Sequence, residues 1–151
     1  MSTKYHLAQM NTGRALHPMD DPQMAGFMDE LDPVNAIADA SPGFVWRLQT
    51  DTGNATDIRP TADPMYLVNM SVWESLEQLM GFVRYPSHLA LLKRRLEWFE
   101  RADGPSFVMW WVPLGHIPTP EEGLERLAAL AADGSSPFAF DFKHQHPAPT
   151  A

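Results

Sequence analysis

The sequence contains no cysteine, and this absence excludes several classes of function. Disulfide bridges, thiolate nucleophiles and Cys-ligated zinc or iron–sulfur sites all require that residue. No expected helix carries a His-x-x-x-His or Glu-x-x-His pair, so a non-haem zinc or iron triad is not indicated. No apolar run approaches the roughly 20 residues of a membrane span, and the first residues lack the apolar core of a secretory signal. These features predict a cytoplasmic protein.

Basic residues are also scarce. The chain has 11 Lys and Arg against 19 Asp and Glu, which gives a formal net charge of −8. Partners that attract cations, namely nucleic acids and anionic membranes, are therefore not expected. The sequence has no glycine-rich phosphate loop and no nucleophile elbow, so nucleotide-dependent enzymes and serine hydrolases are not indicated either.

Large apolar side chains are abundant in the sequence. The 151 residues are 44% hydrophobic and include five Trp, eight Phe and nine Met. This length fits one domain with a sizeable core, predicted at 1–142, followed by a flexible tail at 143–151. So many aromatic and thioether groups suit an aromatic-lined cavity, a large interface or a core of large side chains.

Local patterns predict four strands and four helices. Alternation of apolar and polar residues predicts strands at 4–11, 43–50, 65–73 and 106–112. Capping residues and apolar periodicity predict four helices. The first spans 22–41, the second is opened by a capping box at 71–74 and ends at about 83, the third spans 86–101, and the fourth runs from Thr119-Pro120 to Gly134. Pro33 is expected to break or kink the first helix. Phe138, Phe140 and Phe142 alternate as in an extended arm.

The order β-α-β-β-α-β indicates a fold class. Units of this kind form an α+β, ferredoxin-like protomer, in which a four-stranded antiparallel sheet has helices on one face. An extra C-terminal helix and the arm follow. The second face of the sheet also needs cover, which we expect from a second subunit.

Two polar residues interrupt the apolar side of the helix predicted at 86–101. His88 and Arg95 are seven residues apart and lie within an apolar arc of roughly 180°. Because a buried charge costs several kcal/mol unless it is paired, the two belong either to an internal polar network or to a pocket. His88 is then a satisfied core imidazole, a general base or an axial haem ligand. Arg95 either pairs with Asp32, Asp39 or Glu74, or holds an anionic ligand group.

Further residues are candidates for ligand contact. The tryptophans can stack on a flat ligand, although at least half of them are expected in the core or an interface: Trp46, Trp73, Trp98, Trp110 and Trp111. Arg47 is a candidate for ligand contact or for a salt bridge at the rim, and Tyr85 for a hydroxyl at the pocket mouth. His116 precedes a helix N-terminus, where it either assists anion binding or bonds backbone carbonyls of a rigid turn.

Several motifs in order resemble a bacterial family of unknown function over roughly residues 4–142. They are Gly43–Arg47, Ser71–Leu76 with Phe82, His88, Arg95–Phe99, Trp110–Pro113 and Gly115–Thr119. That family looks like a branch of the dimeric α/β-barrel superfamily, which includes antibiotic-biosynthesis monooxygenases, haem-degrading monooxygenases, chlorite-dismutase-like haem proteins and stress-response barrel proteins. The resemblance implies a ferredoxin-like protomer, a homodimer formed through the sheets, and a pocket between sheet and helices for ligands ranging from polyketide aromatics to haem.

Three functions follow as expectations. The first is a small-molecule pocket protein, with monooxygenase-like or cyclase-like activity on a flat apolar substrate, in which His88 moves a proton and Arg95 holds an anionic group. The second is a haem-binding barrel with His88 as axial ligand, the one metal-binding role considered. The third is a non-catalytic ligand-binding or structural dimer. The sequence requires no cofactor and leaves open whether the protein is an enzyme.

Overall fold

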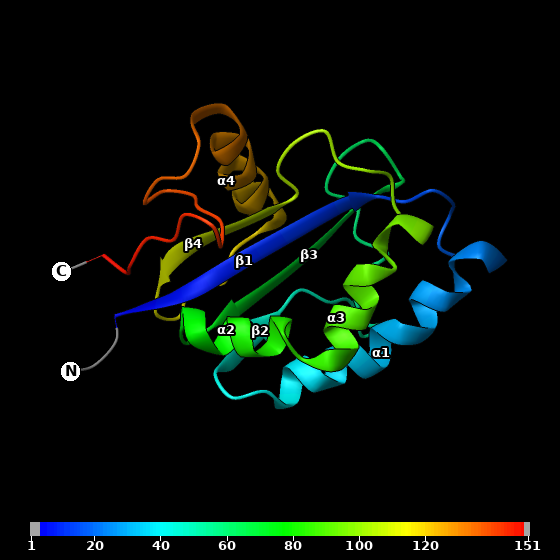
Figure 1. The fold of residues 1–151 in the computed structure, drawn as a ribbon, viewed down its shortest axis with the longest axis horizontal. Coiled ribbons are helices and arrows are strands. Elements are labelled where there is room, and N and C mark those ends of the chain that lie inside the picture. The colour runs from blue at the N-terminus through cyan, green and yellow to red at the C-terminus, as the bar shows by residue number, and fades with distance from the viewer. Residues whose placement is uncertain (1–3, 150–151) are drawn as a thin grey trace.

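The computed structural model describes residues 4–149, in which one antiparallel sheet organises the chain. Its four strands are β1 (Tyr5–Arg14), β2 (Phe44–Arg47), β3 (Tyr66–Trp73) and β4 (Phe107–Pro113). They are ordered β2-β3-β1-β4, so β1 and β3 form the centre (Figure 1). This is the α+β, ferredoxin-like arrangement predicted from the sequence. Within residues 4–149, no helix is long and apolar enough to cross a membrane.

The helices lie on both sides of the sheet. α1 (Ala25–Ala40), α2 (Leu76–Val83) and α3 (Pro86–Lys93) lie over one face, with α1 and α3 side by side (Figure 1). α4 (Pro120–Asp133) covers the other face, because its Leu127 and Leu130 pack against Met10 and Trp110. Strand alternation therefore sorts side chains between an α4 side and an α1–α3 side.

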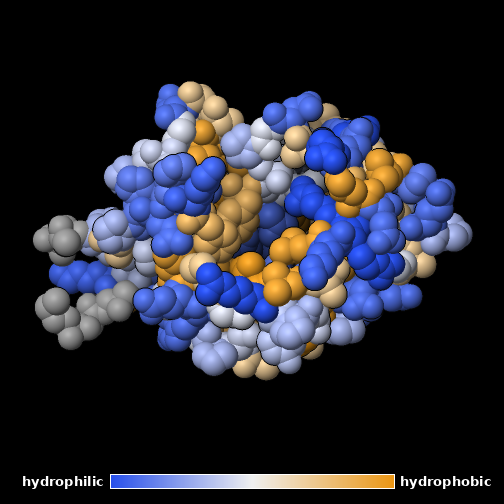
Figure 2. All heavy atoms as spheres, in the orientation of Figure 1, coloured by the Kyte–Doolittle hydropathy of each residue, from blue (hydrophilic) through white to orange (hydrophobic). Residues whose placement is uncertain are grey.

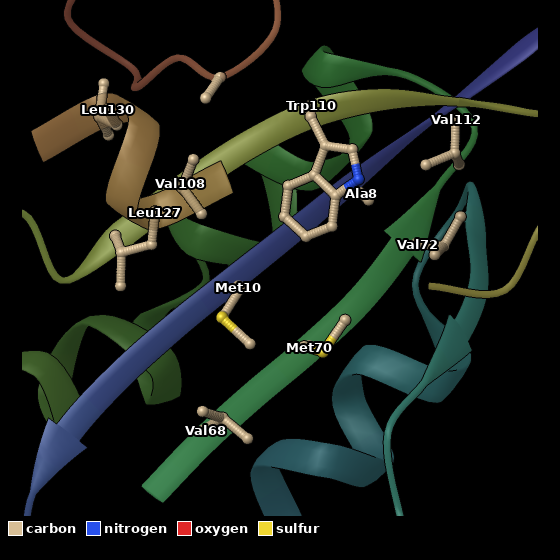
Figure 3. Packing of buried hydrophobic residues seen from close by; sticks show 11 residues of the cluster. Ala8, Met10, Val68, Met70, Val72, Val108, Trp110, Val112, Leu127 and Leu130 are labelled. Carbon is tan, nitrogen blue, oxygen red and sulfur yellow. The ribbon is translucent and has the colours of Figure 1, made fainter. Parts of the chain in front are cut away.

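The α4 side is a closed apolar core within one chain, shown in Figure 3. Gly123 lets α4 approach closely, since a Cβ there would meet the Met10 side chain. Leu48 and Ile58 from the β2–β3 connection extend the cover. The expectation that a second subunit covers this face is therefore corrected: α4 and residues 48–65 already bury it.

The beginnings of α1 and α2 and the course of α1 through Pro33 can be compared with the sequence predictions. Asp21 caps a 3-10 turn (Pro22–Met24) that leads into α1, as its sequence predicts. α1 continues through Pro33, so the expected break is wrong. Proline removes one N–H of the helix, and Pro33 lies at an exposed position of α1. The capping box expected at 71–74 is also wrong. Ser71 lies inside β3, and Ser75 caps α2 by accepting from the Gln78 N–H at 3.2 Å.

The helix predicted at 86–101 ends early. α3 stops at Lys93, and a 3-10 turn follows at Arg95–Glu97. The reason is a competing backbone pairing with the end of β1: the Leu16 N–H donates to Trp98 O at 2.8 Å, and the Glu100 N–H donates to Arg14 O at 2.9 Å. This pairing holds the segment that carries Arg95 beside the sheet.

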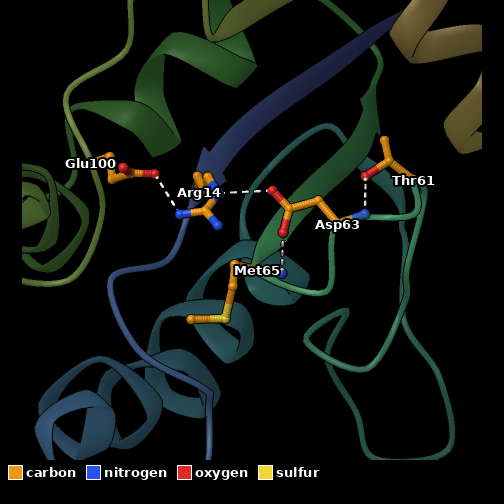
Figure 4. Close-up of polar contacts among 5 residues, drawn as sticks. All are labelled: Arg14, Thr61, Asp63, Met65 and Glu100. Atoms are coloured by element: carbon orange, nitrogen blue, oxygen red, sulfur yellow. Dashed lines mark hydrogen bonds and ion pairs between the residues drawn. The ribbon is translucent and has the colours of Figure 1, made fainter.

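Ion pairs reinforce that junction. The Arg14 guanidinium donates to Asp63 at 2.8 Å and to Glu100 at 2.9 Å (Figure 4). The Met65 N–H and Arg14 together hold the pKa of Asp63 below its ordinary value. The β2–β3 connection, β1 and the turn after α3 thus meet at one end of the sheet.

The C-terminal arm extends the sheet edge at β4. Met109 and Phe140 exchange two backbone hydrogen bonds of 2.8 and 2.9 Å, and the Trp111 indole donates to His146 O at 2.9 Å. The flexibility expected of residues 143–151 stays a prediction, and residues 150–151 lie outside the described part.

Candidate functional site

A cavity of about 440 Å³ lies between the sheet and the α1–α3 layer. Its floor is formed by central-strand side chains, namely Gln9 and Asn11 from β1 and Asn69 and Ser71 from β3. Figure 2 shows a hollow near the middle of this face, with hydrophilic residues at its base and hydrophobic residues on its sides. The volume falls in the range of small-molecule sites.

The floor is a connected hydrogen-bond network. The Gln9 amide donates to Ser71 Oγ at 2.7 Å and to Asn69 Oδ1 at 3.1 Å. Asn11 Nδ2 donates to Gln9 Oε1 at 3.3 Å. Trp73 Nε1 donates to Ser71 Oγ at 2.8 Å from the next position on the same face of β3. Such networks fix the side chains that compose them.

The network leaves hydrogen-bonding capacity unused. Among residues 4–149, Asn69 Nδ2 has no acceptor and Asn11 Oδ1 has no donor. Ser71 Oγ accepts two hydrogen bonds, so its own proton is available to donate. The floor therefore offers a ligand two donors, the Asn69 amide and the Ser71 hydroxyl, and one acceptor, Asn11 Oδ1.

The remaining lining is mostly apolar, and it also includes Arg47, His88 and Arg95 and several neutral polar side chains, namely Thr12, Asn35, Asn54 and Thr56. No Asp or Glu of the described chain lines the cavity, although acidic residues outnumber basic ones in the sequence. The apolar lining comes from all the surrounding elements and includes Phe27, Leu31, Val34, Leu67, Leu79, Phe82, Leu91, Trp98, Phe99, Phe107 and Phe142. The site therefore suits a ligand with an apolar body and a neutral or anionic polar group.

His88 lines the cavity from the first turn of α3. Its Nδ1 lies 3.0 Å from Val83 O and must donate, because a carbonyl oxygen only accepts. The Phe82 ring packs against the imidazole at a centroid distance of 4.9 Å. Burial lowers the pKa of His88, and the bond to Val83 offsets part of that effect. The neutral ring keeps Nε2 as an acceptor, for which the described chain supplies no partner.

Arg95 lines the same cavity from the 3-10 turn. Its Nη2 donates to Thr12 O at 2.9 Å, and the described residues place no carboxylate within 4.0 Å of it. The ion pair considered for it with Asp32, Asp39 or Glu74 is therefore corrected. The backbone pairing of Trp98 with Leu16 carries the Arg95 segment toward β1 instead.

Arg47 and Trp98 also line this cavity. Arg47 donates to Asp39 Oδ1 at 2.7 Å and to Gly53 O at 2.7 Å, so the predicted rim salt bridge is confirmed. Trp98 is buried and packs its ring against Phe27 at 5.6 Å. Four of the ten candidate residues thus meet at one cavity: Arg47, His88, Arg95 and Trp98.

The other candidates lie elsewhere. Trp46 and Trp110 pack on the α4 side, and Trp73 is buried beside the floor, against Leu79 and Phe82. Tyr85 is 47% exposed and does not line the cavity. Trp111 lies at the β4 edge, where its indole binds the His146 carbonyl.

His116 belongs to a different polar contact. Its Nε2 lies 2.7 Å from Glu122 Oε1, and Glu122 Oε2 accepts from Trp110 Nε1 at 2.8 Å. The expectation that this imidazole bonds backbone carbonyls is corrected, because Glu122, in the first turn of α4, brings a carboxylate within reach. Among residues 4–149, no group of three His, Cys, Asp or Glu is arranged to hold a metal ion.

Sequence reasoning missed the polar floor. Gln9 and Asn11 alternate with Ala8 and Met10, and Asn69 and Ser71 alternate with Val68, Met70 and Val72. Two neighbouring strands therefore each carry a pair of polar residues on the face opposite their apolar side, two amides on β1 and an amide and a hydroxyl on β3. That period-two pattern was the available signal, because a helix-covered face is normally apolar.

A family model described as "Domain of unknown function (DUF3291)" matches residues 6–151. The chain belongs to this family, which confirms the resemblance to a family of unknown function. A search of curated proteins finds no match.

Solved structures of similar fold include three of which more than nine-tenths of the chain is covered. A putative antibiotic biosynthesis monooxygenase from Nitrosomonas europaea is 10% identical, with 78% of this chain and 95% of that chain covered and a TM-score of 0.47. SnoaB, a cofactor-independent oxygenase from Streptomyces nogalater, is 12% identical, with 76% and 97% covered and a TM-score of 0.48. A conserved protein from Methanosarcina mazei Go1 is 10% identical, with 73% and 93% covered and a TM-score of 0.49.

Proposed function

We propose that this DUF3291 protein binds a small aromatic weak acid in the cavity and removes a proton from it with His88. One observation carries the proposal: a neutral imidazole, and an arginine for which residues 4–149 supply no carboxylate partner, line a cavity to which those residues contribute no Asp or Glu. A cationic lining in a chain of net charge −8 is a local feature and not a consequence of composition.

The ligand class follows from the lining. Aromatic and aliphatic walls favour a flat apolar body. The Arg95 guanidinium donates to Thr12 O but has no carboxylate partner among residues 4–149. It therefore favours an anionic ligand group, with which it gains a charge-assisted hydrogen bond. The free Asn69 amide and Ser71 hydroxyl add neutral donors for the same group or a neighbouring oxygen.

The chemistry follows from His88. Its Nδ1 is fixed by Val83, so Nε2 is the nitrogen that accepts the substrate proton. Arg95 and the floor donors then stabilise the negative charge that remains on the substrate. Such an electron-rich anion is the species that reacts with dioxygen in a monooxygenase-like reaction, or with a carbonyl carbon in a cyclase-like one.

Binding is tested by calorimetry with 2-naphthoate and its neutral analogue 2-naphthamide. We expect the wild type to prefer the acid, and Arg95→Gln to lose about tenfold or more in naphthoate affinity with little change for the amide. Arg101→Gln is the matched control, since Arg101 is exposed and outside the cavity. Equal loss in both arginine variants, or no preference for the acid, contradicts the proposal.

Haem binding by His88 is the second candidate. A histidine whose Nδ1 donates to a backbone carbonyl presents Nε2 in the manner common for metal ligands. Arg95 would then hold a propionate. When bound, haem would supply one-electron and oxygen chemistry, and His88 Nε2 and the apolar lining would hold it.

A homodimer is also proposed, with the apolar side chains exposed along α3 as its contact. Tyr85, Leu89, Leu92 and Leu96 are 39–52% exposed. Residues 84–101 carry five basic and two acidic side chains, whereas residues 15–46, which include the adjacent α1, carry six acidic and no basic ones. A two-fold axis that places α1 on the partner's α3 pairs these opposite charges and covers the apolar stripe.

A further inference from the structure

One row of side chains connects the polar floor to the β4 end of the cavity. Asn11 pairs directly with Asn69 on β3 and with Phe107 on β4. Side chains paired across neighbouring strands lie about 5 Å apart. A polar group bound at the Asn11–Asn69 position is therefore followed, toward β4, by an aromatic surface.

The C-terminal arm closes that end. Phe142 stacks on Phe107 with a ring-centroid distance of 4.9 Å and an interplanar angle of 14°, and both rings line the cavity. The arm is anchored two residues earlier by the two backbone hydrogen bonds between Phe140 and Met109. Gln145 Nε2 donates back to Phe142 O at 3.0 Å. The Phe142 ring thus has a fixed position beside Phe107, even though the two residues are far apart in the sequence.

We propose that Phe142 determines ligand size at this site. The stacked Phe107–Phe142 pair ends the cavity at β4, so a flat ligand whose polar group lies on the floor extends no farther than these rings. The position of this ring pair, in a cavity of about 440 Å³, leads us to expect that acids with one or two fused rings bind better than longer ones. This inference rests on the proposed binding of an aromatic acid.

The test uses a graded series of acids: benzoate, 2-naphthoate and anthracene-2-carboxylate. Binding of each is measured by calorimetry to the wild type, Phe142→Ala and Phe142→Leu. We expect Phe142→Ala to raise the affinity for the three-ring acid relative to naphthoate by about tenfold, since one group in an apolar wall discriminates on that scale. Phe142→Leu preserves more packing and should give a smaller increase in the same direction.

Phe138→Ala is the matched control, because Phe138 is on the same arm but is 42% exposed and does not line the cavity. It should leave the ratio of affinities unchanged. If both Phe142 variants still bind naphthoate and keep the wild-type ratio of three-ring to two-ring affinity, the proposed role of Phe142 in ligand size is wrong, and the proposed function is unaffected. If no acid of the series binds the folded wild type, the proposed function is wrong, and the proposed role of Phe142 is wrong with it.

Discussion

The imidazole of His88 and the carbonyl oxygen of Val83 are 3.0 Å apart, and this contact fixes which ring nitrogen faces the cavity. Val83 is the last residue of α2, and His88 lies in the first turn of α3. The tight connection between two short helices therefore sets the tautomer of the candidate base.

The first prediction concerns pH and stability. Burial lowers the folded-state pKa of His88, so the unfolded chain binds a proton that the folded chain does not. Stability from this residue is fully present above the unfolded value, about 6.5, and is lost as the pH falls through the lowered folded value. Relative to His88→Gln, the wild type should lose unfolding free energy as the pH falls below about 6.5. Parallel stability curves for the two proteins would refute this.

A second prediction addresses the polar floor. Gln9→Met removes both donors to Asn69 and Ser71 and should lower the unfolding free energy by about 1–3 kcal/mol, because buried polar partners remain unsatisfied. Gln49→Met, at an exposed site, should stay within about 0.5 kcal/mol of the wild type. Urea unfolding measures both. Similar values for the two variants would mean that the floor is not a connected network.

The third prediction concerns association. Light scattering with size-exclusion chromatography should give a dimer at micromolar concentration. Leu89→Glu with Leu96→Glu should yield a monomer, because it places charge in the apolar stripe on and just after α3. Leu114→Glu changes a leucine that is 50% exposed elsewhere and should leave the dimer intact. A wild-type monomer excludes the dimer, and a dimer that survives the double substitution places its interface elsewhere.

A fourth prediction separates the haem alternative. If His88 is an axial ligand, hemin added to the purified protein gives a shifted Soret band that His88→Ala abolishes. Tyr85→Ala is the control, since Tyr85 is near His88 in sequence but outside the cavity. An unchanged hemin spectrum with wild-type protein eliminates haem ligation and leaves the acid-binding proposal in place.

The architecture was readable from the sequence because each element has a local cause. Strand alternation placed β1, β3 and β4 to within a few residues, and Thr119 caps α4 as expected. The end of α3 was not readable, because it depends on pairing between Trp98 and Leu16, which are distant in sequence. Periodicity alone extends a helix past such a contact.

The site was only partly predictable for a similar reason. His88 and Arg95 were identified as polar residues on an apolar helix face, and both line the cavity. Trp46 and Trp110 carried equally suggestive side chains, but strand register turns them to the α4 side. Phe142 was identified only as part of an extended arm, because its place at the cavity depends on the long-range bridge between Phe140 and Met109.

The most direct test of the central claim is the ionisation of a bound chromogenic phenol. 4-Nitrophenol is titrated with protein at a pH where the free phenol is mostly protonated, and the phenolate absorbance is followed. The account predicts that the wild type lowers the pKa of the bound phenol, so phenolate absorbance appears on binding. His88→Gln should bind the phenol without this ionisation. Binding with no phenolate signal in the wild type, or an equal signal in His88→Gln, would contradict proton removal by His88.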